Sequence, residues 1–226
     1  MSLLAQISQN LQALGYDFPQ QTRLLDELIQ QYLLRIEKWN KIHNLTAIRN
    51  PQDMLYQHVM DSLAVLPHIQ GPNIIDVGSG AGLPGIPLAL ARPDWQVSLV
   101  ESNQKKASFL QQVKIELALQ NVTVIAKRIE DIHAEYTVDT IITRAFSDLG
   151  DFIQLTQSLM AENEGGGRWV AMKANCSDAE LQQVRAPFSI ENIVSLTVPG
   201  LNAARQLIII KKLTTGNKIY RSFDSV

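Results

Sequence analysis

Apolar residues in the first seventy positions recur at the spacing of helices. Between Gln20 and Trp39 they return every three or four residues, which is the pattern of one buried stripe on an amphipathic helix. A second such face, from Met54 to Leu66, lies between two prolines, the first of which stands where an initial helical turn tolerates it. The sequence therefore predicts a helical extension over residues 1–70 that needs a partner surface.

The pattern changes after Gly71-Pro72. Short apolar runs now alternate with helix-length segments, which is typical of a parallel sheet covered by helices. The helix expected at 104–119 has an apolar face that would pack on this sheet, and a Pro199-Gly200 turn predicts a final antiparallel pair. The expected strands are 73–77, 97–100, 122–126, 140–143, 168–172, 190–198 and 207–210.

These elements predict a Rossmann-like α/β domain over residues 71–213, with a mostly parallel seven-stranded sheet and helices on both faces. The N-terminal helical extension precedes this domain. A polar tail at 214–226 follows it and is expected to be disordered.

The composition limits the remaining choices. The chain has 226 residues, of which 46% are hydrophobic, so it can bury one sizeable core. Cys176 is the single cysteine, which excludes an intramolecular disulfide and a multi-thiolate metal cluster. The N-terminus lacks the basic start and apolar run of a secretory signal, and no segment approaches a membrane span. We expect a cytoplasmic protein without a metal site or a membrane partner.

The strongest local signal is the glycine-rich segment DVGSGAGLPG at 76–85, between a predicted strand and a predicted helix. Glycines at such a turn let the backbone approach a nucleoside closely. Dinucleotide sites have the pattern G-x-G-x-x-G, but the sixth position from Gly78 is Leu83, whereas G-x-G-x-G fits through Gly80 and Gly82. The spacing favours an adenosyl ligand without a pyrophosphate.

An acidic residue completes this pattern. Glu101 follows Gly78 by 23 residues, at the end of the second predicted strand, where a carboxylate can accept hydrogen bonds from both ribose hydroxyls. Taken singly, the loop also fits a tight turn without a ligand, and Glu101 fits a solvated carboxylate. Together, in this strand context, they predict a site for S-adenosylmethionine.

Several segments resemble one known family. Residues 76–89 are similar to the cofactor loop of the RsmG (GidB) family, and WNKIHNLTAI at 39–48 and HVMDSL at 58–63 resemble stretches that precede its methyltransferase domain. RIE at 128–130, TRAF at 143–146 and MK at 172–173 match later segments in the same order. The resemblance runs from about residue 20 to about residue 212, so it covers the extension as well as the sheet.

The resemblance implies a class I S-adenosylmethionine-dependent enzyme that methylates N7 of a guanine in the 530 loop of bacterial 16S rRNA. Its partner would be that rRNA, in the small ribosomal subunit or an assembly intermediate. Ala174 and Gln206 stand where the family usually has glycine and histidine, which puts fine substrate contacts in doubt but not the chemistry. The residues implied to contact the cofactor are Gly78, Leu83, Ile129, Glu130 and Arg144.

This reaction limits what the protein has to supply. Guanine N7 carries a lone pair and no proton, so its attack on a methyl group needs no general base, and we assign no catalytic base. Catalysis would come from holding the acceptor in line with the departing sulfur. Residues 143–149 lack the D/N-P-P-aromatic motif of amino-methylases, and Cys176 fits an ordinary small residue better than a cytosine-C5 nucleophile.

The chain has 20 Lys and Arg residues but 22 Asp and Glu residues, so it has no overall positive charge. Contacts with RNA would therefore need a local patch of positive charge. Each candidate also has a structural alternative: a helix cap for Asn44, a buried structural ring for His58, core packing for Phe146 and a solvated side chain for Lys173. Arg144 also fits a contact with an RNA phosphate. The five candidates are Asn44, His58, Phe146, Lys173 and Arg205.

Three other functions stay open at this point. A methyltransferase could act on another RNA or on a small molecule. A ribosome-binding nucleotide sensor would keep the pocket without turnover. An NAD-dependent oxidoreductase is disfavoured by Leu83 within the glycine pattern.

Overall fold

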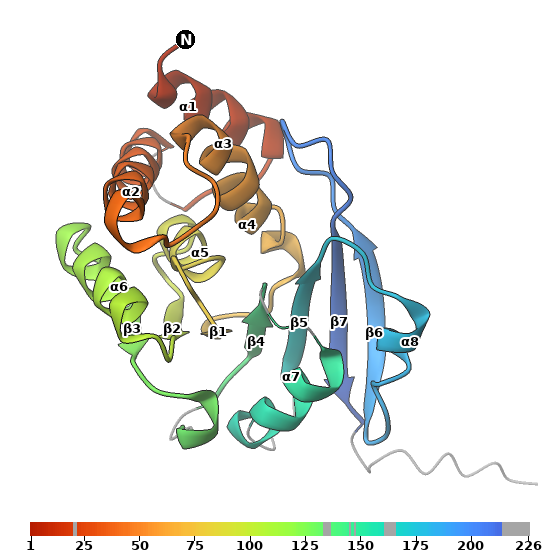
Figure 1. Ribbon diagram of the computed structural model, residues 1–226. Coiled ribbons are helices and arrows are strands. Elements are labelled where there is room, and N and C mark those ends of the chain that lie inside the picture. The colour runs from red at the N-terminus through yellow and green to blue at the C-terminus, as the bar shows by residue number, and fades with distance from the viewer. Residues whose placement is uncertain (20–21, 133–136, 145, 147, 161–165, 214–226) are drawn as a thin grey trace, which may run out of the picture.

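The computed structural model describes residues 1–19, 22–132, 137–144, 146, 148–160 and 166–213. Helices cover a single sheet, and the N-terminal helices lie together at one end of the molecule (Figure 1). The expected start of the extension helix at 20–21, residues 145, 147 and 165, and the tail at 214–226 lie outside the described residues.

The sheet has seven strands in the order β3-β2-β1-β4-β5-β7-β6, and the predicted mostly parallel arrangement is confirmed. β1 to β5 are parallel, whereas β7 runs antiparallel to both of its neighbours. The strand order reverses between β1 and β4, and ligands of open α/β sheets bind at the carboxyl ends of strands at such a point. The strands are β1 (Asn73–Val77), β2 (Gln96–Val100), β3 (Val122–Ile125), β4 (Thr140–Thr143), β5 (Arg168–Lys173), β6 (Phe188–Ser195) and β7 (Gln206–Lys212).

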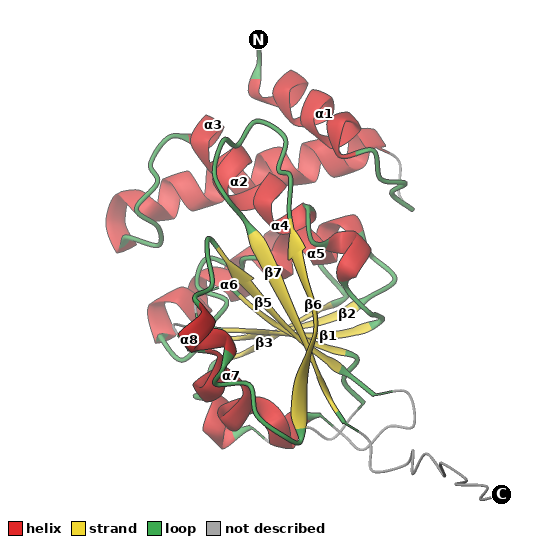
Figure 2. Ribbon diagram, turned by 90° about the vertical axis from the view of Figure 1, so that its right-hand side faces the viewer, coloured by secondary structure: helices red, strands yellow, loops and turns green. Residues whose placement is uncertain are grey.

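Helices pack on both faces of the sheet, and the extension lies on the α5 side (Figure 2). The α-helices of the extension are α1 (Leu3–Leu14), α2 (Thr22–His43), α3 (Pro51–Met54) and α4 (Asp61–Leu63). Those that follow are α5 (Gly85–Ala91), α6 (Gln104–Glu116), α7 (Leu149–Thr156) and α8 (Asp178–Leu181). Three short 3₁₀ turns are η2 (Leu66–His68), η3 (Ile129–Asp131) and η4 (Gln157–Leu159).

Alternate residues along a strand belong to two different apolar clusters, one on each face of the sheet. Ile74 of β1 packs with the extension, α5 and α6, whereas Ile75 and Val77 pack on the opposite face with α7. The first cluster runs without a break from Ile7 in α1 to Ile209 in β7. The extension therefore buries its apolar stripe against the sheet domain and shares its core. The domain boundary at residue 70 stays a prediction.

The second helical segment differs from the expected single α-helix. Residues Leu55–Met60 form a π-helical segment, η1, between α3 and α4, in which the amide of Asp61 donates to the carbonyl oxygen of Tyr56. The apolar spacing of this segment fits an α-helix, and it does not reveal the extra residue in the turn. π-Segments are frequent at functional sites, and this one leads directly to the cavity described below.

β6 also differs from its expected bounds of 190–198. It begins two residues earlier, at Phe188, and ends three residues earlier, at Ser195. Val198 belongs instead to the following turn, where its carbonyl oxygen accepts a hydrogen bond from the amide of Leu201. Within the described part of the chain, we find no helix with the length and apolar character needed to cross a bilayer.

Candidate functional site

The glycine loop follows β1 at the point where the strand order reverses. Gly78 has φ 71° and donates its amide hydrogen to the carbonyl oxygen of Val100 over 2.9 Å, which holds the loop against the end of β2. A Cβ atom on Gly78 would meet nothing within 4 Å, so the backbone here faces open space. The predicted close approach of a ligand to this backbone is therefore sterically allowed.

The other predicted loop residues have different roles. The Gly80 amide donates to Oε2 of Glu101 over 2.8 Å. A Cβ atom on Gly82, which has φ 91°, would lie 2.5 Å from Cγ1 of Ile86, so this glycine permits close packing of the loop on α5. Leu83 is buried in the same core. Gly82 and Leu83 thus shape the loop from behind, whereas Gly78 faces the cavity.

Glu101 is buried at the end of β2 and ties three segments together. Its Oε2 accepts the Gly80 amide, and its Oε1 accepts the Asn103 amide over 2.8 Å. An ionised carboxylate has about four lone-pair sites, so these two bonds leave acceptor capacity. Glu101 can therefore brace the loop and still accept hydrogen bonds from ribose hydroxyls.

A cavity of about 220 Å³ opens between the glycine loop and η3. Ile129 and Glu130 line it, as the resemblance implies, and Phe146 closes one side. Its size lies below the roughly 300–1,000 Å³ typical of sites for drug-sized ligands, so it fits part of S-adenosylmethionine, such as its nucleoside. The lining residues are Val77, Gly78, Val100, Glu101, Ser102, Lys127, Arg128, Ile129, Glu130, Phe146 and Leu155.

Asp76, in β1 directly before the loop, holds the far end of the loop, a role that the sequence interpretation did not identify. Its side chain is fully buried, and Oδ2 accepts the Gly85 amide over 2.9 Å. Burial raises the pKa of this carboxyl to about 7, although hydrogen bonds from Gly85 and Ser79 oppose the rise. Oδ1 has no hydrogen-bond partner among the described residues. An acid inside an apolar strand was the signal that could have identified it.

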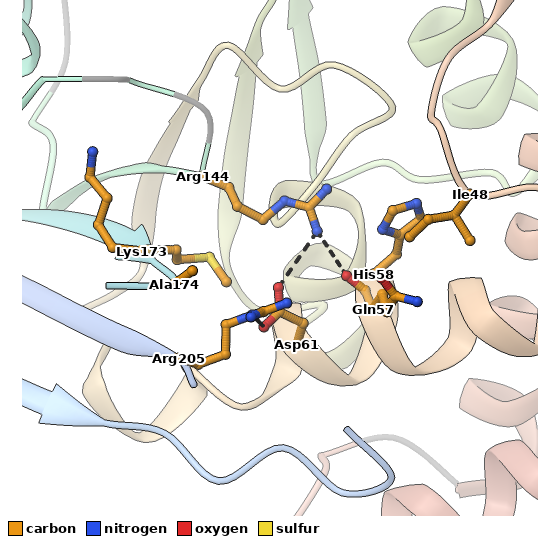
Figure 3. Close-up of a pocket in the computed structure, with 9 residues that line it drawn as sticks. Ile48, Gln57, His58, Asp61, Arg144, Lys173, Ala174 and Arg205 are labelled. Carbon is orange, nitrogen blue, oxygen red and sulfur yellow. Dashed lines mark hydrogen bonds and ion pairs between the residues drawn. The ribbon is translucent and has the colours of Figure 1, made fainter. Parts of the chain in front are cut away.

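A second cavity, of about 300 Å³, lies between the extension and the carboxyl ends of β4 and β5 (Figure 3). It brings together four predicted site residues from four separate segments: His58, Arg144, Lys173 and Arg205. The sequence interpretation did not identify the other residues that line it, which are Ile48, Gln57, Asp61, Met172 and Ala174.

Asp61, at the start of α4, pairs with two of these cations. Its Oδ1 lies 2.8 Å from Nε of Arg205, and its Oδ2 lies 3.7 Å from Nη1 of Arg144. Nη1 of Arg144 also donates to the carbonyl oxygen of Gln57 over 3.2 Å. Figure 3 shows both guanidinium groups converging on the Asp61 carboxylate. Arg144, which the resemblance assigns to the cofactor, therefore lines the second cavity and not the first.

His58 lies in η1 and is buried. Its Nε2 is 2.9 Å from Oγ1 of Thr46, and that hydroxyl also accepts the Ile48 amide. Burial, together with the nearby Arg144 charge, lowers the pKa of His58 to about 4, so the ring is neutral at physiological pH. Its Nδ1 has no hydrogen-bond partner among the described residues. The ring thus lines the cavity and holds one buried polar atom without a hydrogen bond among the described residues.

Lys173 ends β5 and is largely buried. Its Nζ donates to the carbonyl oxygen of Phe146 over 2.7 Å and pairs with Glu180 of α8 at 2.6 Å. Cys176 lies nearby, and burial together with Glu180 raises the pKa of its thiol to about 11, so it is not a thiolate nucleophile. Gln206 accepts the Cys176 amide, which links the start of β7 to the segment after β5.

Two predicted substrate residues lie elsewhere. Asn44 is exposed, directly after the end of α2, with φ 47°, which is the conformation of a residue that ends a helix. It lines neither of the two cavities. Phe146 lines the first cavity, and its ring lies 5.5 Å from that of Phe152 in the core. The substrate contacts predicted for Asn44 and Phe146 stay predictions.

Each of the two cavities is lined by a residue just beyond the end of β4. Arg144 lines the second and Phe146, two residues later, lines the first. The arrangement can bind a nucleoside in one cavity and an electron-rich or anionic group in the other. It can therefore support transfer of a group between two bound molecules.

Comparisons with known proteins agree with this arrangement. A family model described as rRNA small subunit methyltransferase G matches residues 25–209. "Ribosomal RNA small subunit methyltransferase G" of Nitrosospira multiformis is 52% identical over 218 residues, which is 94% of this chain and 99% of that protein. The protein of the same name from Nitrosomonas eutropha is 50% identical and covers 93% of this chain and 98% of its own length.

Solved structures show the fold. A SAM-dependent methyltransferase from Aquifex aeolicus is similar with a TM-score of 0.51 at 16% identity, over 71% of this chain and 93% of that one. M. jannaschii TYW2, solved in complex with AdoMet, has a TM-score of 0.52 at 14% identity, over 67% and 73% of the two chains. The predicted Rossmann-like class I fold is confirmed. With relatives at half identity over almost its whole length, the chain belongs to the family of ribosomal RNA small subunit methyltransferase G.

Proposed function

We propose that this protein transfers a methyl group from S-adenosylmethionine to N7 of a guanine in the 530 loop of 16S rRNA. Membership of the family supports methylation of small-subunit rRNA. The SAM-dependent methyltransferases among its structural neighbours agree with S-adenosylmethionine as the methyl donor. The guanine and its N7 atom rest on the sequence resemblance, and the partner is the rRNA in the small subunit or an assembly intermediate, in the cytoplasm.

One observation carries the proposal. Arg144 and Phe146, two residues apart after β4, line two different cavities at the switch point of the sheet. A methyl donor in the cavity of Phe146 and an acceptor in the cavity of Arg144 would be separated only by this short segment. Such proximity is what an in-line transfer requires, and holding the reactants in this way can supply roughly 7 to 11 kcal/mol of the barrier.

The first cavity has the groups that an adenosyl ligand needs. Glu101 would accept the ribose hydroxyls, the open backbone of Gly78 would lie against the ligand, and Ile129 would cover its base. Gly80, Gly82 and Leu83 would hold the loop in this shape. When bound, the cofactor supplies an electrophilic methyl group on a sulfonium.

The second cavity suits a purine acceptor. Its two arginines, Arg144 and Arg205, can contact the O6 edge of guanine or a phosphate of the RNA. No side chain there has to remove a proton, because guanine N7 carries none. The low pKa of His58 makes its ring a weak base, and the thiol of Cys176 is protonated, which agrees with a reaction that needs neither a base nor a nucleophile from the protein.

The test is a transfer assay with labelled S-adenosylmethionine and small ribosomal subunits that lack N7 methylation, followed by mapping of the label. The wild-type chain is expected to label one guanine N7 in the 530 loop, and Glu101→Ala is expected to abolish labelling. Asp94→Ala, at an exposed position, is the control and is expected to behave as the wild type. Cofactor binding without label on subunits, free rRNA or tRNA would contradict the proposal and favour a nucleotide-sensing protein.

A further inference from the structure

The second cavity contains one acidic side chain among three cationic ones. Asp61 is 3% exposed, and it faces Arg144 and Arg205 within a wall that Lys173 completes. A buried carboxylate is costly unless it is paired, so these ion pairs are required for its ionised form. The arginines depend on Asp61 in turn: burial and, to a smaller extent, the nearby Arg205 charge lower the pKa of Arg144, whereas the Asp61 charge raises it. Asp61 therefore allows two like charges to share one small cavity.

The three partners come from distant parts of the chain. Asp61 begins α4 of the extension, Arg144 follows β4, and Arg205 directly precedes β7. The bond between Asp61 and Arg205 joins residues that are 144 positions apart. This cluster is thus a polar connection between the extension and the carboxyl edge of the sheet.

Each arginine keeps donors available after these contacts. The hydrogen bonds described for Arg205 use Nε, toward Asp61, and one Nη1 hydrogen, toward the carbonyl oxygen of Ala204. A guanidinium has five N–H donors, so about three remain. Arg144 is similarly fixed through Nη1 by Gln57 and Asp61. Both groups are held on one side and can donate on the other.

We propose that Asp61 is a positioning residue, whose carboxylate holds Arg144 and Arg205 in the one arrangement from which their remaining N–H groups bind a phosphate of the RNA substrate. The inference rests on the proposed function for the identity of that substrate. Fixed guanidinium groups suit phosphate because they can donate two parallel hydrogen bonds. Without Asp61 the two arginines would repel each other and occupy several positions.

A positioning role and a purely structural role give different kinetics. Asp61→Asn keeps the shape of the side chain but removes its charge, which makes the cavity more positive. We expect kcat for methyl transfer to fall by about 10- to 100-fold, because the acceptor is misplaced. We expect KM for the subunit to stay the same or to decrease, because phosphate binding depends on net positive charge. A rise in KM with unchanged kcat would overturn the proposal.

Asp53→Asn is the matched control, because Asp53 is an exposed acid in α3 of the same extension. It changes the net charge equally and is expected to leave kcat unchanged. Arg205→Gln completes a double-mutant cycle with Asp61→Asn. If Asp61 acts through Arg205, the double variant is expected to be no slower than the slower single variant. Additive losses would contradict this mechanism.

A second measurement needs no rRNA. Phenylglyoxal modifies accessible arginines, and mass spectrometry reports the rate at each position. Arg144 and Arg205 of the wild-type protein are expected to react at least fivefold more slowly than the exposed Arg23. In the Asp61→Asn variant, this difference in reaction rate is expected to be smaller. Equal rates in the wild type would refute the positioning role even if the Asp61→Asn chain does not fold. Slow phenylglyoxal modification of Arg144 and Arg205, combined with no rRNA methylation by the wild type, would instead refute the proposed function. It would leave the positioning of the two arginines by Asp61 unaffected.

Discussion

The hydroxyl of Tyr32 donates a hydrogen bond to the carbonyl oxygen of Ala81 over 2.7 Å. Tyr32 is fully buried in α2 of the extension, and Ala81 lies in the glycine loop. Burial raises the pKa of the Tyr32 hydroxyl, so it stays protonated and remains a donor. The extension therefore holds the cofactor loop from behind.

Replacing this tyrosine tests the connection. Tyr32→Phe removes only the hydroxyl and leaves the Ala81 carbonyl oxygen without this partner, which is expected to lower the free energy of unfolding by about 1–3 kcal/mol. The affinity for S-adenosylmethionine, measured by calorimetry, is expected to fall by roughly five- to tenfold as the loop loosens.

Tyr16→Phe provides the matched control for this experiment. The Tyr16 hydroxyl also donates to a backbone carbonyl oxygen, that of Ala64 over 3.3 Å, but away from the loop. It is expected to lower stability slightly and to leave cofactor affinity unchanged. Equal cofactor affinity in Tyr32→Phe and the wild type would show that the loop holds its shape without the extension.

Replacing two glycines of the loop is expected to affect different properties, namely stability for one and cofactor binding for the other. A Cβ atom on Gly82 would lie 2.5 Å from Ile86 and 3.0 Å from Leu110, so Gly82→Ala is expected to lower the melting temperature strongly. Gly78→Ala meets open space and is expected to cost only about 1–2 kcal/mol for its positive φ, but its methyl group would enter the cofactor cavity. Calorimetry of the folded Gly78→Ala protein is expected to detect little or no cofactor binding, and normal binding would contradict the position of the cavity.

The buried His58 predicts a loss of stability in acid. Its pKa is about 4 in the folded chain against 6.5 ordinarily, so between these values the unfolded chain binds more protons and stability falls as pH decreases. From pH 7 to pH 5 the contribution of this group is expected to be about 2 kcal/mol. The measurement is urea unfolding at both pH values. His58→Asn is expected to flatten this pH dependence, whereas His43→Asn, at an exposed position, is expected to keep the wild-type slope.

The single cysteine is expected to be dispensable. With a thiol pKa of about 11, Cys176 is protonated at neutral pH and cannot act as a nucleophile. Cys176→Ala is expected to keep methyl transfer within about twofold of the wild type, and iodoacetamide is expected to alkylate the wild-type thiol only slowly at pH 8. A loss of transfer in Cys176→Ala, with normal folding, would point to covalent chemistry at a pyrimidine carbon.

Local pattern was sufficient to predict the sheet and the cofactor loop. Alternating apolar runs identified all seven strands, and the glycine spacing with Glu101 identified residues that the fold brings into contact, as the bond between Gly80 and Glu101 shows. Both signals are local, because they depend on strand ends and on the turn that follows β1. The extension helix at α2 was likewise visible in its apolar stripe.

The partners of the second cavity could not be predicted in the same way. Asp61 stands among apolar helical residues, and only the tertiary fold brings it to Arg205, 144 positions later. The π-segment that precedes it has no distinct apolar period. The left-handed backbone of Asn44, directly after a helix end, was likewise not visible in the pattern, and its predicted contact with the substrate stays a prediction. Tyr32 belongs to the apolar stripe of α2 and was therefore interpreted only as a core residue. The apolar spacing does not show where its hydroxyl points.

The two-residue spacing between Arg144 and Phe146 has a mechanical consequence. Both residues lie just beyond the end of the central strand β4, so a displacement of this strand would move one wall of each cavity. The extension supplies the opposite wall of the second cavity, so its position relative to β4 would set the space available there.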